Sequence, residues 1–550
     1  MQLIILNMKN KLVMKCLRYI LLLFMPLLWS CFEDKGNYDY EDLGDIVIEN
    51  VPELIEALSG ADRIQVTPKI TSTLEGEIND NNPNYEFVYK FDKTSGSLNG
   101  NWAEPWVVLN TEGSMNLDTL ANFPAGSYIC YLSVKDIRTG IETIKTFDVK
   151  ITSSVYEGWM VLCNEGEENR IRMDMISRIS AERMVAMHDL LTSLGLPEGH
   201  NATQIAFAPS IFFGKEAIYV MGETGAYKIN AETFSSGTSW NMKATDFILS
   251  PDDEPISYAA LNNGFQYDNT NRFCVTTAGN VYAITSMTSG AAFELPINTS
   301  TRGGSVEYKV APYIGISMLR PGNANCALMY DIDNLRFVGW AYSQNADALQ
   351  TMAPLEDPVG NKLFSYKTGK KLVYMESTSF SGGVVYSILQ DKSGERSIYA
   401  INAGGRTFTQ EAYYEKLNAP DFNQATKFAF HSQFPFMFYA VKNKVYLYDL
   451  GTGTNYPLEG IKLGADEEVT MLKFNLYQQP SLDWLDSSEE FLAKQYNLIV
   501  GSYDNGAAGV NGGKVGFYKI DRSSHSVTKL EEYDGFAKVK DVVYRERRKQ

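Results

Sequence analysis

The feature of this sequence that most constrains its fold is a repeated pair of short apolar segments in the C-terminal two thirds of the chain. Each pair consists of an apolar β-like run, a turn, and a second run that ends near an acidic or amide residue. The pairs begin near residues 159, 218, 273, 327, 384, 438 and 498. A steady period of this size predicts repeated β-units that bury their apolar faces by packing against one another.

Each interval of the repeat has room for about four short strands with their loops, which is the content of one β-propeller blade. We therefore predict an all-β chain with a β-propeller over residues 156–550. Seven blades fit the spacing best, and six or eight are the alternatives. A multidomain chain of β-sandwiches is the rival fold. The 33 Tyr, 28 Phe and 43 Gly residues favour aromatic strands separated by glycine turns in either case.

One segment of the repeat region departs from the β pattern. Apolar residues recur at helical spacing between Ala181 and Leu194, and Gly195 follows where a helix usually stops. We expect a helix there that decorates the first blade.

A second β region precedes the repeat, at residues 44–153. Residues 85–91 alternate between aromatic and other side chains, which predicts a strand with one buried face. Two further alternating runs, at 124–136 and 144–151, are separated by a glycine turn and predict a hairpin. We interpret this region as one β-sandwich.

The N-terminus has the features of a lipoprotein leader. Basic residues precede an apolar run at 19–29, which is too short to span a bilayer, for which about 20 apolar residues are needed. The run ends in Leu-Trp-Ser-Cys at 28–31, which resembles a lipobox. We predict a signal peptide at residues 1–30 and lipidation of Cys31. The alternative is an ordinary secretory signal with an accidental cysteine.

The residues after Cys31 carry a family resemblance. Residues 31–43 form an acidic tether, and its Asp-Lys-Gly-Asn-Tyr-Asp-Tyr segment at 34–40 resembles the start of Bacteroidetes PKD-like family lipoproteins. Gly126-x-Tyr128 and the strands that follow also resemble PKD modules, although the Gly-Asp-Gly turn common in PKD repeats is missing. The resemblance implies a lipid-anchored, surface-exposed outer-membrane protein that accompanies a SusC/SusD-type, TonB-dependent importer of nutrients such as glycans or peptides.

The net charge of the chain limits the classes of partner that it can bind. The formal net charge is −17, and residues 1–30 carry four basic residues and no acid, so the remainder carries about −21. Such a surface repels phosphate backbones, so we expect no nucleic-acid partner. We expect contact with the membrane through the lipid anchor only.

No motif for catalysis, a metal or a cofactor is recognisable in the sequence. The four histidines show neither an HExxH motif nor ligand spacing on one element, and no nucleophile elbow or phosphate-binding loop occurs. We therefore expect no enzyme, no cofactor and no metal. Four of the six cysteines lie in apolar runs and are interpreted as buried thiols, with a disulfide left open; they are Cys130, Cys163, Cys274 and Cys326.

Tryptophans give the only indication of a binding surface, because exposed indole rings stack on sugars and hold peptide side chains. The candidates are Trp102, Trp106, Trp240, Trp340 and Trp484. The leading hypothesis is a non-catalytic ligand-binding or scaffold accessory of the importer. The alternatives are a propeller-type glycoside hydrolase or lyase, which would need a central acid-lined funnel, and a purely structural partner of the importer.

Overall fold

The structure is a computed structural model of residues 1–550. It describes residues between 44 and 545, with gaps of which the longest are 93–105, 209–216, 250–255, 262–271, 285–291, 317–325, 342–350 and 475–495. The predicted leader, Cys31 and the tether lie outside the described residues. Among the described residues, no helix has the length and hydropathy needed to cross a bilayer.

The N-terminal elements form three small sheets around one hydrophobic core. The core takes buried residues from all three sheets, and the predicted alternation at 85–91 places Tyr85, Phe87, Tyr89 and Phe91 in it. The sheet orders are β1-β4-β5, β2-β10-β9-β6-β7 and β3-β8, with the strands β1 (Ile46–Glu49), β2 (Leu54–Leu58), β3 (Arg63–Val66), β4 (Lys69–Ser72), β5 (Gly76–Ile78), β6 (Tyr85–Asp92), β7 (Trp106–Val108), β8 (Leu117–Leu120), β9 (Gly126–Asp136) and β10 (Glu142–Thr152). The predicted hairpin is the antiparallel pair of β9 and β10.

The described residues after β10 form seven further sheets of three or four strands. The first is β13-β12-β11-β36, and each of the others uses strands that are consecutive in the sequence. The strands of the first three sheets are β11 (Gly158–Glu165), β12 (Arg170–Arg178), β13 (Met184–Met187), β36 (Lys538–Arg545), β14 (Ala202–Ala208), β15 (Ala217–Gly222), β16 (Ala226–Asn230), β17 (Ile256–Leu261), β18 (Arg272–Thr276) and β19 (Val281–Ile284).

The other four sheets contain four strands each. They are β20 (Gly315–Ile316), β21 (Cys326–Asp331), β22 (Arg336–Ala341) and β23 (Ala353–Pro354); β24 (Lys371–Ser377), β25 (Val384–Gln390), β26 (Arg396–Asn402) and β27 (Thr409–Tyr414); β28 (Lys427–Phe430), β29 (Phe436–Val441), β30 (Lys444–Asp449) and β31 (Thr454–Pro457); and β32 (Glu467–Phe474), β33 (Leu498–Asp504), β34 (Gly513–Asp521) and β35 (Ser526–Phe536). The short helices are η2 (Thr192–Leu194), α2 (Met242–Asp246), η3 (Phe380–Gly382) and η4 (Phe422–Gln424).

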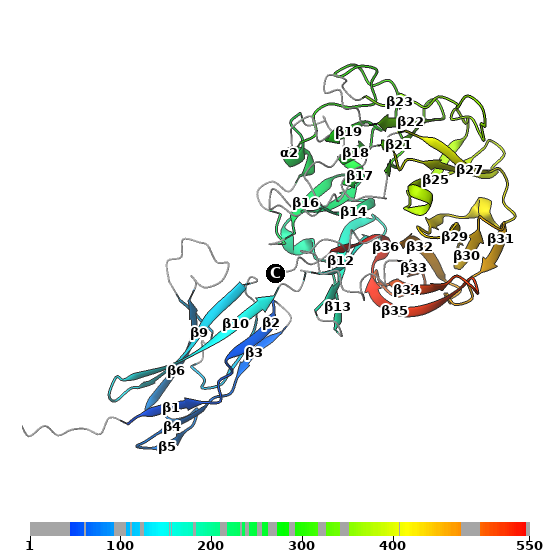
Figure 1. The fold of residues 1–550 in the computed structure, drawn as a ribbon. Helices are drawn as coiled ribbons and strands as arrows, with labels where there is room; N and C mark the ends of the chain where they lie inside the picture. The colour runs from blue at the N-terminus through cyan, green and yellow to red at the C-terminus, as the bar shows by residue number, and fades with distance from the viewer. Residues whose placement is uncertain are drawn as a thin grey trace, which may run out of the picture.

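The sheets follow one another around a common centre in sequence order, as propeller blades do (Figure 1). The last strand, β36, pairs with β11 of the first sheet from Gly158↔Arg545 to Asn164↔Lys538. One sheet is therefore built from both ends of the C-terminal region. This pairing joins the beginning of the ring to its end and covers an edge of β11 that would otherwise be open.

The predicted repeat is confirmed as sheet structure. From the second pair onward, the two runs of each pair are neighbouring strands of one sheet, as in β15–β16 and β29–β30. The acidic residue that often ends the second run has a local role. The Oδ1 atoms of Asp449 and Asp521 each accept backbone N–H groups from the turn that follows. Such Asx turns are a common way to close a tight connection.

The predicted helix at 181–194 was wrong. Met184–Met187 is strand β13, the outer partner of β12, and only Thr192–Leu194 makes a single 3-10 turn. Tertiary pairing with β12 overrode the helical spacing of the apolar residues. The predicted stop is right, since Gly195 adopts a left-handed φ of 62° directly after the turn.

The four described cysteines are buried, as predicted, and all four are free thiols, a point that the sequence left open. Burial raises the pKa of the Cys130 and Cys326 thiols to about 12, so the reactive thiolate is scarce at neutral pH. We expect none of the four to react with a thiol reagent such as DTNB at pH 8 in the folded protein, and all four to react in concentrated guanidinium chloride. Fast labelling of any of them in the folded state would contradict this assignment.

Candidate functional site

The strands nearest the centre of the ring are the natural place to look for a site. In each of the seven sheets one end strand packs against its counterparts in neighbouring sheets; for example, β28 contacts β32 and β32 contacts β36. We call these the inner strands; they are β14, β17, β20, β24, β28, β32 and β36. Ligands of propellers meet the ends of such strands because the sheets converge there.

Two carboxylates and a lysine connect four inner strands. Lys473 of β32 donates from Nζ to Asp541 Oδ1 of β36 at 2.6 Å and to the Val542 carbonyl at 2.7 Å. The other oxygen of Asp541 accepts the backbone N–H of Ile205 in β14 at 3.1 Å. The charge of Lys473 also acts on Glu376 of β24. Hydrogen bonds thus join β32, β36 and β14, and Glu376 of β24 lies within reach of the Lys473 charge.

Glu376 has an unusual ionisation. Burial raises its pKa to about 7, although hydrogen bonds and the charge of Lys473 act in the opposite direction. Its Oε2 accepts the Phe430 backbone N–H of β28 at 2.8 Å and the Tyr374 hydroxyl at 3.0 Å. A carboxyl group with this pKa exchanges a proton near neutral pH, which suits both a ligand-binding switch and an acid or base catalyst.

The Glu376 ionisation predicts a pH-dependent effect of the Glu376→Gln substitution. Because the folded-state pKa lies above the ordinary 4.5, the carboxyl group's contribution to stability is full below pH 4.5 and is lost as the pH rises through 7. We expect the free energy of unfolding of the variant, relative to wild type, to increase by on the order of 2 kcal/mol between pH 5.5 and pH 8. Urea unfolding at both values measures it.

The comparison must use the difference between variant and wild type. Burial lowers the pKa of His431 to about 4, so the stability that its neutral imidazole contributes to the protein is lost as the pH falls below about 6.5. In the wild-type curve this change partly masks the pH dependence that comes from Glu376. A variant-to-wild-type difference that does not change with pH would contradict the raised pKa of Glu376.

A second group of charges lies at the beginnings of the same inner strands. Lys427 is the first residue of β28, Glu468 the second of β32, and Lys538 the first of β36. Lys538 donates to Glu468 at 2.6 Å. Lys427 is half-buried, and burial lowers its pKa to about 8, with Lys540 and Lys538 acting in the same direction. These are conditions under which an anion would be attracted.

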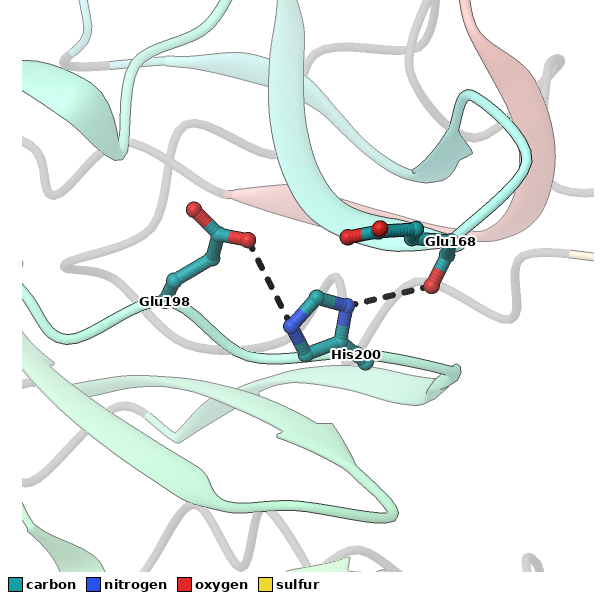
Figure 2. Close-up of side chains that lie close together, drawn as sticks. All are labelled: Glu168, Glu198 and His200. Atoms are coloured by element: carbon teal, nitrogen blue, oxygen red, sulfur yellow. Dashed lines mark hydrogen bonds and ion pairs between the residues drawn. The ribbon is translucent and has the colours of Figure 1, made fainter.

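A third cluster lies away from the inner strands. Figure 2 shows Glu168 from the β11–β12 turn beside Glu198 and His200 from the loop before β14. One potential metal-ligand atom from each of the three lies within 4.8 Å of the others. His200 Nδ1 lies 3.1 Å from the Glu168 carbonyl oxygen, and its Nε2 lies 3.4 Å from Glu198 Oε1. With Nδ1–H donated to that carbonyl, Nε2 is the nitrogen free to act as a ligand.

This cluster is a possible divalent-cation ligand set, but its bonds also have a structural use. Both glutamates are exposed, and the same loop is fixed to β12 by hydrogen bonds from Ile171 N–H to the Gly199 carbonyl and from Asn201 N–H to the Asn169 carbonyl. Sequence reasoning missed the set because Glu168 is 30 residues from Glu198. The Glu198-x-His200 spacing was the only signal, since alternate residues of an extended chain share a face.

The predicted tryptophans do not gather into one site in the described residues. Trp340 on β22 is fully buried, and its ring meets Phe273 edge-on at 5.2 Å. A ring without exposed surface cannot stack on a ligand, so the binding role predicted for Trp340 was wrong. Trp106 lies in β7, but its side chain is outside the part of the molecule that the structure describes. Trp102, Trp240 and Trp484, like Cys31, lie outside the described residues.

The inner-strand charges were also missed by sequence reasoning. Glu376, Lys427, Lys473 and Asp541 belong to four sheets, and no motif links them along the chain. Single charged residues within short apolar runs, such as Lys427 before Phe428, were the only local signal.

Comparison with known proteins gives one family match. The model of the PKD-like family matches residues 31–195. The predicted PKD-like resemblance is thus confirmed for this segment, which extends beyond β10 into the first sheet of the ring. No curated protein matches the chain.

Solved structures resemble the chain only remotely. A quinonprotein alcohol dehydrogenase-like protein from Bacteroides thetaiotaomicron shares 12% identity at a TM-score of 0.45, with 91% of this chain and 99% of that chain covered. A putative 6-phosphogluconolactonase from Bacteroides uniformis shares 11% identity at a TM-score of 0.33, with 68% and 96% covered. Similarity at this level says nothing about the activity of this chain.

Proposed function

We propose that this chain is a surface-exposed outer-membrane lipoprotein, anchored through Cys31, that binds a ligand without transforming it. In this proposal residues 1–30 are the signal peptide, 31–43 the tether, 44–153 a PKD-like sandwich and 156–550 a seven-bladed propeller. The lipobox-like residues at 28–31 and the PKD-like match support the anchor and the spacer. Seven described sheets and the β11–β36 closure support seven blades.

The observation that carries a binding function is the position of the inner-strand charges. Lys473, Asp541, Glu376 and Lys427 come from four separate sheets and are all half-buried at the centre of the ring. Charged groups are costly to bury, so their concentration there indicates a polar contact surface and not a simple packing core. A nutrient ligand held at this centre fits an accessory of a SusC/SusD-type importer.

A propeller-type glycoside hydrolase or lyase is the second candidate, and the pKa of Glu376 favours it. A carboxyl group with a pKa near 7 can serve as a general acid or base near neutral pH, and Asp541 supplies a second carboxylate on the inner strands. Against it, each carboxylate already accepts a backbone N–H from a neighbouring sheet, which is a structural use. Turnover of a glycan by wild type that is lost in Glu376→Gln would establish the enzyme.

The anchor and the partner are tested together. Protein purified from native membranes should carry a lipid on Cys31 by mass spectrometry, and an outer-membrane importer should co-purify with it. A Cys31→Ser variant serves as control and should lose the membrane fraction. An unmodified Cys31, or recovery of the wild type from the cytosol, would overturn the anchor. Co-purification of the importer without any ligand binding would instead favour a purely structural partner.

A further inference from the structure

The imidazole of His200 is held so that one ring nitrogen faces a carboxylate. Its Nδ1 lies 3.1 Å from the Glu168 backbone carbonyl oxygen, which can only accept a hydrogen bond, so Nδ1 carries the proton. The lone pair is then on Nε2, which lies 3.4 Å from Glu198 Oε1 and is directed toward it in Figure 2. A histidine that ligates a metal commonly donates its other N–H to a backbone carbonyl in this way.

The fold fixes the loop that carries two of the three ligands. The His200 backbone N–H donates to Thr224 Oγ1 at 2.8 Å. Gly199 is buried between the exposed Glu198 and the half-buried His200, and a Cβ at residue 199 would collide with the Tyr227 hydroxyl. The glycine therefore faces inward, and the two ligands on either side of it face outward together. Ligands positioned in advance lower the cost of binding an ion.

The two glutamates of the cluster lack a balancing cation in the part of the chain that the structure describes. No lysine or arginine there forms an ion pair with Glu168 or Glu198, and Arg170, two positions after Glu168, is bonded to Glu165 and Asp189 instead. Potential ligand oxygens of the two glutamates lie within 4.8 Å of each other. Two carboxylates at such a separation repel each other, and a cation between them removes the repulsion.

The donor atoms select the kind of cation. Oxygen ligands alone suit Ca²⁺ and Mg²⁺, whereas an imidazole nitrogen suits Zn²⁺ and similar transition-metal ions. Two ligands of one tetrahedral Zn²⁺ lie about 3.3 Å apart. The pair of His200 Nε2 and Glu198 Oε1 already has this spacing, at 3.4 Å, and rotation of the exposed Glu168 side chain brings in the third ligand. Three protein ligands leave a fourth position for water.

We propose that Glu168, Glu198 and His200 form a binding site for one Zn²⁺ ion. The site goes beyond the proposed binding function and does not depend on it. Glu168 belongs to the turn between β11 and β12 of the first sheet, whereas the other two ligands precede β14 of the second sheet. The ion therefore links the first two sheets of the ring. An ion that binds only the folded state stabilises that state.

Isothermal titration calorimetry on the full-length protein in detergent, freed of metal with EDTA and then dialysed, measures binding of Zn²⁺, Ca²⁺ and Mg²⁺ separately. The variants His200→Asn and Glu198→Gln each remove one ligand. His525→Asn and Glu167→Gln are the matched controls. His525 also faces one carboxylate, that of Asp449 at 3.5 Å, and Glu167 is exposed in the β11–β12 turn.

We expect wild type and both controls to bind one Zn²⁺ per chain, and His200→Asn and Glu198→Gln to bind it at least about tenfold more weakly. Zn²⁺ should raise the midpoint of thermal unfolding of wild type and leave that of His200→Asn unchanged. Circular dichroism checks that each variant folds, and Glu198→Gln decides if His200→Asn does not. Equal Zn²⁺ affinity of wild type and these variants, no binding at one ion per chain, or tighter binding of Ca²⁺ than of Zn²⁺ would overturn the site.

Discussion

Removal of residues 538–550 should abolish the cooperative unfolding of the C-terminal sheets. Strand β36 supplies the innermost strand of the first sheet, and its Val539, Val542 and Tyr544 side chains are buried in the core shared with the last sheet. Burying three such side chains contributes on the order of 5 kcal/mol, which is a large part of the stability of an ordinary domain. Circular dichroism and thermal unfolding measure the loss.

Truncation after Arg545 is the matched control for this deletion. It removes residues 546–550 and keeps the whole of β36, so we expect it to unfold as the full chain does. The buried guanidinium of Arg545 also bonds the carbonyl oxygens of Val155 and Ala231, which ties β36 to two further segments. If the 538–550 deletion retained a sharp, wild-type transition, closure through β36 would not hold the ring together.

Substitution of Asp174 by alanine should be the most destabilising single change in the first sheet. Asp174 is fully buried on β12, where its Oδ1 accepts from Arg172 Nε and from the Asp189 backbone N–H, both at 2.7 Å. Arg172 in turn reaches Asn511 at 2.6 Å, beside the last sheet. Losing the carboxylate leaves the Asp189 backbone N–H without its acceptor and leaves Glu165 as the remaining carboxylate partner of the buried Arg172, which costs about 3 kcal/mol.

An exposed ion pair provides the contrast. Asp118 pairs with Arg63 in the N-terminal region, with 53% of each side chain exposed, so Asp118→Ala should cost less than about 1 kcal/mol. Denaturant unfolding of both variants at pH 7 gives the comparison. Similar losses for the two variants would show that the Asp174 network contributes no more than a surface pair.

The sequence predicted the all-β class because periodicity is a local property. Each pair of apolar runs, such as those at β25 and β26, carries its own alternation and its own turn residues, and from the second pair onward each forms neighbouring strands. The exception is instructive. Residues 184–187 have apolar spacing that fits a helix, yet they form an outer strand, because the exposed edge of β12 offered backbone partners that the local pattern cannot reveal.

The candidate site was predicted much less well. Tryptophan was chosen by residue type, and the one candidate whose side chain the structure describes, Trp340, is packed in the core. Glu376 and Lys427 looked like ordinary charges in the sequence. Their properties come from burial and from residues more than 40 positions away, such as Lys473 for Glu376 and Lys540 for Lys427.

The sequence by itself therefore determined which segments become strands, where the turns fall and that the units repeat, since these depend on residues close together in the chain. Only the tertiary structure decided that β36 returns to β11 and that four sheets bring their charges to one centre. The reason is that burial and Coulomb interaction depend on distance in space, which the order of residues does not state.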